Sequence, residues 1–79
     1  MKTYMIVFAV ADGWRRTLLI ARIKQLGPWM SHFENVWFLR SNLTAVQVQG
    51  DLMAWVTQTD TFLVVQAIPQ NHGGLMVPP

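Results

Sequence analysis

The feature that most constrains this chain is a change from helical to strand periodicity at Gly27-Pro28. Apolar residues before the pair recur at the spacing of one helix face, at Leu19, Ile23 and Leu26. This spacing predicts an amphipathic helix over 15–26 that packs on a sheet. Glycine commonly follows the last helical residue and proline cannot continue a helix, so the helix should end here.

Two short strand-like runs follow the proline, over 29–33 and 36–40. They are joined by Glu34-Asn35, and asparagine tolerates the left-handed backbone that a two-residue connection requires. The sequence therefore predicts a β-hairpin directly after the first helix.

The first and last strands, predicted over 3–10 and 61–68, are apolar at successive positions and therefore on both faces. Between them, Thr44 and Gln47 have the spacing of a capping box, which predicts a second helix from Ala45 to about residue 56. Its buried stripe is expected to consist of Ala45, Val48, Leu52 and Trp55 or Val56. A glycine inside this helix, Gly50, costs about 1 kcal/mol relative to alanine and suggests close packing.

The resulting order, βαββαβ, predicts an α+β fold of the ferredoxin-like type. Two helices would cover one face of a four-stranded antiparallel sheet of order 4-1-3-2, within a domain over 1–68. Residues 69–79 are expected to form a flexible C-terminal tail. Its apolar residues Leu75, Met76 and Val77 either form a short edge strand or fray. The second face of the sheet should be covered by a partner sheet or by these three residues.

The composition favours a partner. Apolar residues make up 52% of the 79 residues and charged residues only 13%, about half the usual share for a soluble domain. With no cysteine available for disulfides, oligomerisation is the expected source of extra stability, and a homodimer is the default. The predicted dimer interface uses apolar residues outside the main helix stripes: Val46, Met53, Leu75, Met76 and Val77.

The chain has no apolar run of the roughly 18 residues that a membrane span needs, and its first residues lack a signal-peptide pattern. We therefore expect a soluble cytoplasmic protein with no membrane partner.

Four of the six basic residues lie between positions 15 and 24, although the net charge is only +2. Together with a nearby tryptophan they form a candidate nucleic-acid-binding patch, in which the aromatic ring stacks on a base. The patch consists of Trp14, Arg15, Arg16, Arg22 and Lys24. A solvated helix surface is the favoured alternative, because the charge is modest for a nucleic-acid binder.

Five short segments carry a resemblance to a known family: TYMIVF at 3–8, IKQLGPW at 23–29, NVWFLRS at 35–41, LTA at 43–45 and TDTFLVV at 59–65. Over residues 3–68 the chain resembles the small SinR-like family, which is related in fold to the CRISPR spacer-acquisition endoribonucleases and to similar antitoxin endoribonucleases. The resemblance implies a ferredoxin-like homodimer in a bacterial or mobile-element setting.

In the nuclease relatives, the resemblance implies an aspartate at the end of the first strand of each protomer, holding a divalent metal near the dimer axis. Ala9 stands at that position here, and the nearest carboxylate is Asp12. Metal-dependent phosphodiester hydrolysis needs oxygen ligands that activate water. Asp12 is thus the one catalytic candidate, although a turn or cap role is favoured for it.

The remaining polar residues suggest no other chemistry: neither histidine has a metal-ligand spacing to a second ligand, and no cofactor motif is present. We therefore expect a non-catalytic, homodimeric interaction protein that binds a protein or a nucleic acid, without cofactor or metal. The alternatives are a metal-dependent endoribonuclease using magnesium at Asp12 and a nucleic-acid-binding module without catalysis.

Overall fold

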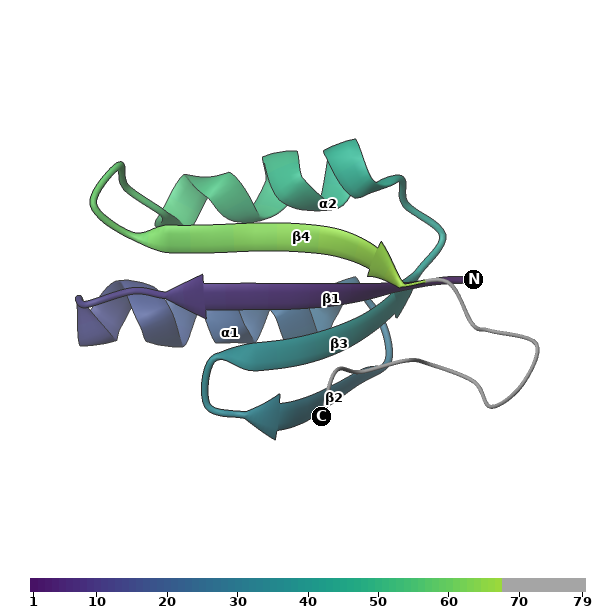
Figure 1. The fold of residues 1–79 in the computed structure, drawn as a ribbon, viewed down its shortest axis with the longest axis horizontal. Coiled ribbons are helices and arrows are strands. Elements are labelled where there is room, and N and C mark those ends of the chain that lie inside the picture. The colour runs from purple at the N-terminus through teal and green to yellow at the C-terminus, as the bar shows by residue number, and fades with distance from the viewer. Residues whose placement is uncertain (68–79) are drawn as a thin grey trace.

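The computed structural model describes residues 1–67, which form one four-stranded antiparallel sheet and two α-helices (Figure 1). In chain order the elements are β1 (Lys2–Ala9), α1 (Gly13–Leu26), β2 (Trp29–Phe33), β3 (Val36–Ser41), α2 (Ala45–Leu52), a 3-10 turn η1 (Met53–Trp55) and β4 (Thr61–Ala67). The strand order is β2-β3-β1-β4. The predicted ferredoxin-like α+β fold is therefore confirmed, while the predicted tail over 69–79 and its edge strand lie outside the described residues.

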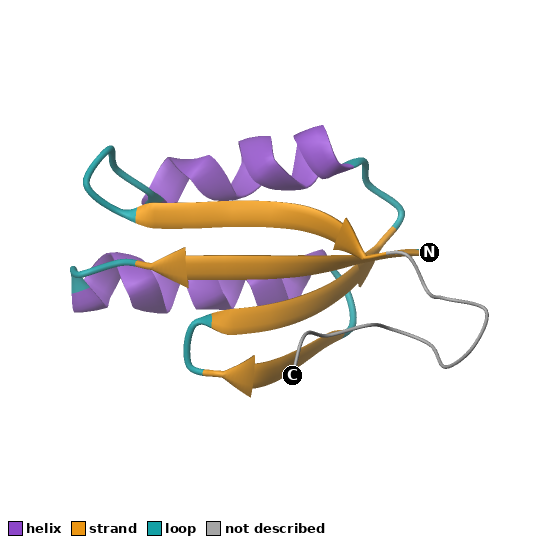
Figure 2. Cartoon of the chain, in the orientation of Figure 1, coloured by secondary structure: helices purple, strands orange, loops and turns teal. Residues whose placement is uncertain are grey.

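Strand β1 lies in the interior of the sheet, between β3 and β4, as its two-sided apolar pattern predicts (Figure 2). Tyr4 pairs with Leu39 of β3 on one side and with Gln66 of β4 on the other. First and last strands are thus neighbours, and the hairpin of β2 and β3 is attached through β3. Strands β2 and β4 form the two edges.

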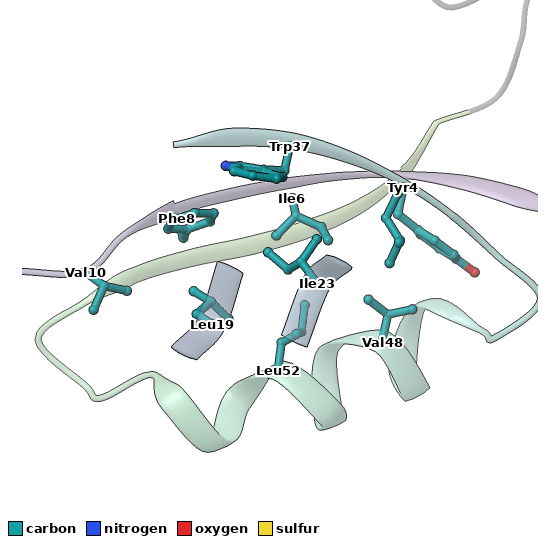
Figure 3. Packing of buried hydrophobic residues seen from close by; sticks show 10 residues of the cluster. Tyr4, Ile6, Phe8, Val10, Leu19, Ile23, Trp37, Val48 and Leu52 are labelled. Carbon is teal, nitrogen blue, oxygen red and sulfur yellow. The ribbon is translucent and has the colours of Figure 1, made fainter. Parts of the chain in front are cut away.

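The core lies between one face of the sheet and both helices (Figure 3). Alternate residues of β1 point toward the helices, and they meet side chains from α1 and α2. The largest fully buried side chains are Tyr4, Ile6, Phe8, Leu19, Ile23, Leu39, Val48 and Leu52. The Tyr4 hydroxyl donates a hydrogen bond to the Leu43 carbonyl oxygen, so its polar end is satisfied.

Helix α1 begins at Gly13, two residues before the expected start, because Asp12 caps it. The Asp12 carboxylate accepts hydrogen bonds from the backbone N–H groups of Trp14 and Arg15, at 2.9 and 3.1 Å. These bonds satisfy two helix donors that would otherwise lack partners. The cap role weighed for Asp12 in the sequence is the one that the structure shows.

Gly27 ends α1 as predicted, but by a different geometry. Its φ of 157° and ψ of −173° belong to an extended region that glycine alone favours, and the chain runs directly into β2. A Cβ at this position would overlap the carbonyl oxygen of Arg40 in β3. The Pro28 carbonyl then accepts a hydrogen bond from the Arg40 amide at 2.9 Å. The segment that follows the helix is therefore bonded directly to β3.

Helix α2 begins with the predicted capping box, in which Thr44 Oγ1 accepts from the Gln47 amide and Gln47 Oε1 accepts from the Thr44 amide. It ends at Leu52, earlier than expected, and continues as the 3-10 turn η1. The close packing suggested for Gly50 is wrong, because a Cβ there would have no neighbour within 4 Å.

Candidate functional site

The face of the sheet opposite the helices carries a continuous apolar surface. On β1 this face receives Met5 and Val7, the residues between those that point to the core. Directly across from Met5 lie Phe38 of β3 and Val65 of β4. We call this surface the open face and define it by Met5, Val7, Met30, Phe33, Val36, Phe38, Leu63 and Val65.

Much of the open face is exposed to solvent. Met30 and Leu63 are 59% and 52% exposed, whereas Ile6 on the covered face of β1 is fully buried. Phe38 is buried, so the centre of the face is packed while its margins are not. Large exposed apolar surfaces of this kind mark interaction sites in soluble proteins.

One end of the open face contains an apolar hollow of about 170 Å³. It spans the start of β1, the end of β3 and the start of β2, and its lining is formed by Thr3, Pro28, Trp29, Met30, Phe38 and Arg40. The lining is mainly apolar, and Arg40 supplies its charge. A pocket with such a lining can accept an apolar side chain, and its charged group, the Arg40 guanidinium, remains available for a polar contact.

Trp29 of the hollow stacks on a second tryptophan, and a lysine side chain lies over its ring. The rings of Trp29 and Trp37 lie 5.1 Å apart. The Lys24 ammonium lies 4.6 Å from the centre of the Trp29 ring, which is within cation–π range. Lys24, predicted to contact nucleic acid, is thus placed over an aromatic ring of its own chain.

Two of the predicted nucleic-acid-binding arginines are held in ion pairs. Arg15 donates to the Asp60 carboxylate and to the Trp55 carbonyl oxygen. Arg22 donates from Nε and one terminal nitrogen to both oxygens of Asp51, at 2.7 and 2.8 Å. The first pair ties α1 to the loop before β4 and the second ties α1 to α2, so both arginines have a role in the fold.

The ion pairs shift the pKa of their carboxyl groups. The hydrogen bond from Arg15, assisted by the Thr57 amide, lowers the pKa of Asp60 to about 2. The hydrogen bond from Arg22 likewise lowers the pKa of Asp51. In return, the hydrogen bonds that the arginines donate to these carboxylates raise the pKa of both arginines. The charged forms are therefore favoured at neutral pH.

The other members of the predicted patch lie at the start of α1. Trp14 is 73% exposed, and Arg16 lies 3.4 Å from the exposed Glu34 carboxylate. The structure therefore does not bring the five residues of the patch into one free basic surface. Nucleic-acid binding through Trp14 and Arg16 stays a prediction.

The end of β1, where the sequence resemblance led us to look for a metal-binding carboxylate, forms the wall of a second, open hollow of about 390 Å³. Ala9 lines it, with Arg16, Glu34 and Asn35 as its polar side chains. Asp12 is engaged at the helix start. Within residues 1–67 no three histidine or acidic side chains lie close enough together to hold a metal ion.

The predicted dimer interface and the open face are different surfaces. Val46 and Met53 are exposed, but they belong to α2 and η1 in the helix layer. The other predicted interface residues, Leu75, Met76 and Val77, lie outside the described residues. The residues of the open face were missing from the predicted interface, although the two-sided apolar pattern of the first and last strands had indicated an uncovered face.

No family model, curated protein or solved structure matches this chain. Among the described helices, none is long and apolar enough to cross a membrane.

Proposed function

We propose that this chain is a non-catalytic interaction protein that forms a homodimer through the open face of its sheet. The observation that carries the proposal is the apolar row across β1, β3 and β4, in which Met5 lies between the buried Phe38 and the exposed Val65. Burying such a row contributes about 25 cal/mol for each Å² of apolar surface removed from water. The surface is therefore suited to protein–protein association.

A second copy of the chain is the partner that this surface fits best. Two identical apolar faces are self-complementary about a two-fold axis and need no opposite charge on the partner. All four carboxylates of the chain, Asp12, Glu34, Asp51 and Asp60, lie outside the strands. The proposed setting, bacterial or mobile-element, is supported by the sequence resemblance to the SinR-like family.

The oligomeric state tests the proposal. Sedimentation velocity between about 1 and 100 μM should show a dimer of the wild type, since specific association of small domains commonly falls in the micromolar range. Leu63→Glu places a charge on the half-exposed open face and should give a folded monomer. The control, Val46→Glu, changes a still more exposed apolar residue on α2 and should leave the dimer intact.

Two results would contradict the proposal. If the wild type stays monomeric at the highest concentration, the proposed homodimer is wrong. A dimer that Val46→Glu dissociates and Leu63→Glu leaves intact assigns the interface to the helix layer, where it was first predicted. Circular dichroism of each variant confirms that the fold is retained.

The nuclease alternative has its own test at Asp12. RNA is incubated with the wild type and with Asp12→Asn in magnesium or manganese. Asparagine is as good an N-cap as aspartate but lacks the charge that a metal ligand needs, so this variant separates helix capping from catalysis. We expect no cleavage by either protein, and cleavage that Asp12→Asn abolishes would overturn the non-catalytic proposal.

A further inference from the structure

The apolar hollow at one end of the open face is bordered by two hydrogen-bond donors. Among the residues that line it, only Arg40 of β3 is charged. Thr3 of β1 lies directly opposite Arg40 in the register of the sheet, so the two side chains are neighbours on the same face. A guanidinium and a hydroxyl group are therefore available at the hollow, and both can donate to an oxygen atom of a ligand.

The charge of Arg40 is not neutralised by any acidic side chain within residues 1–67. The chain has four carboxylate side chains, and each is engaged elsewhere: one caps α1, and the other three pair with arginines of that helix. A side chain such as that of Arg40 covers apolar surface with its stem while its guanidinium reaches water. The hollow thus combines a mainly apolar lining with a cation that can accept an anionic ligand.

We propose that this hollow binds a small monocarboxylic acid whose other end is one aromatic ring or a branched aliphatic chain. The apolar end would lie among Trp29, Met30 and Phe38, and the carboxylate would lie against Arg40. An apolar cavity of about 150 Å³ holds benzene, whereas pockets for drug-sized ligands measure about 300–1,000 Å³. At about 170 Å³ the hollow is large enough for one ring and too small for a larger molecule.

The charge and the lining together select a carboxylate. A neutral apolar ligand would leave Arg40 unpaired, whereas a guanidinium can donate two parallel hydrogen bonds to one carboxylate. A phosphate group carries more charge and more oxygen atoms than one cation can satisfy, and placing them against an apolar lining costs free energy. A single negative charge on an apolar body fits both features of the hollow.

Binding at the hollow would also regulate the open face, and this consequence rests on the proposed function. Met30 and Phe38 belong both to the hollow and to the open face, so the acid and a second copy of the chain compete for them. With the acid at a concentration equal to its own dissociation constant, the dimer dissociation constant should rise about fourfold, a factor of two for each protomer.

Methionine methyl NMR on the full chain tests the site, with 3-phenylpropanoate as the probe. Met30 lines the hollow, and Met53 lies in the helix layer as an internal control. The wild type is measured at a concentration where sedimentation shows the monomer. The probe should shift the Met30 signal with a dissociation constant of about 1 mM, as expected for a ligand of this size, and leave Met53 unchanged. Equal shifts of both signals, or no Met30 shift at about 10 mM probe, would overturn the proposal.

Two related compounds separate the contributions of the ring and the charge. The amide 3-phenylpropanamide has the same shape without the charge and should bind about threefold to fivefold more weakly, the range of an exposed ion pair. Acetate has the charge without the ring and should bind at least about tenfold more weakly, because it buries little apolar surface. Equal affinities for the acid and its amide would overturn a carboxylate site.

Arg40→Gln assigns the difference between acid and amide to its residue. In this variant the two compounds should bind with equal affinity, and the affinity for the amide should match that of the wild type. Lys2→Gln is the matched control, because it removes the same charge beside Thr3 but from the opposite face of β1. It should leave the preference for the acid in place. An equal loss of preference in both variants would indicate a general charge effect and overturn the proposal.

Sedimentation with and without the acid separates this proposal from the proposed function. A dimer that the bound acid weakens supports the competition at Met30 and Phe38, and a dimer that it leaves unchanged shows that the competition is wrong. If the wild type is monomeric under all conditions, the proposed function fails, while the Met30 shift and the effect of Arg40→Gln still decide whether the hollow binds the acid.

Discussion

The two faces of the sheet are built from the same strands but differ in what they meet. On β1, Tyr4 and Ile6 are fully buried beneath the helices, whereas Met5 and Val7, their direct neighbours, belong to the open face. Both sets are apolar. The burial of a strand residue is therefore decided by whether a helix packs over it, and not by its hydrophobicity alone.

Polar contacts also hold the two helices to each other and to the rest of the fold. Arg15 and Arg22 of α1 reach Asp60 and Asp51, and the Tyr4 hydroxyl is bonded to the backbone beyond β3. These contacts orient the layer on the covered face. The four predictions below test how far the two faces differ, in order of expected effect.

The largest effect is expected from removing a side chain on the covered face. Ile6→Ala leaves a cavity among fully buried neighbours and should reduce the free energy of unfolding by about 2–5 kcal/mol. Leu63→Ala, on the open face, should cost less than about 1 kcal/mol in the monomer, because Leu63 already meets water. Urea unfolding at low protein concentration measures both, and equal losses would mean that the open face is covered.

A smaller loss is expected at the junction between the helix layer and the hairpin. Gly27→Ala forces a non-glycine residue into its extended backbone region, at about 1–3 kcal/mol, and adds the overlap with the Arg40 carbonyl oxygen. Thermal unfolding should show a lower midpoint. An unchanged midpoint would contradict the close approach of helix end and β3. Gly13→Ala is the control, because a Cβ there has no neighbour within 4 Å.

The ion pairs of the helix layer predict an acid-dependent loss of stability. Because the folded-state pKa of Asp60 is about 2, below its usual 3.8, the pair stabilises the fold above pH 3.8. This contribution is lost as the pH falls from about 4 through about 2. Asp60→Asn should reduce the slope of stability against pH in that interval, and an unchanged slope would contradict the pair. Asp51→Asn should act in the same direction, since Arg22 lowers the pKa of Asp51.

The smallest expected effect is a gain in stability. Gly50→Ala replaces an exposed mid-helix glycine with a better helix former and should raise the free energy of unfolding by up to about 1 kcal/mol. Urea unfolding checks the sign. A loss of stability would show that Gly50 is packed against another surface, such as a partner chain.

The candidate sites differ in how much of them the sequence could predict. Asp12 was identified as a cap candidate because the signals that place it, a loop carboxylate before a helix, are local. The partners of Arg15 and Arg22 were not predicted, since Asp60 and Asp51 are 45 and 29 residues away along the chain. Long-range pairs of this kind depend on how two helices cross the sheet, which no local pattern encodes.

By itself the sequence determined the order of elements, the capping box at Thr44, the helix end at Gly27 and the interior place of β1. These features follow from periodicity, capping and backbone sterics, which act over a few residues. The tertiary structure decided which of two apolar strand faces the helices cover, and that an apolar hollow forms where three strands end together. Side-chain alternation makes both faces of the sheet apolar and does not say which one the helices will cover. Because α1 and α2 pack on one face, Met30 and Leu63 of the other face remain exposed for an interaction.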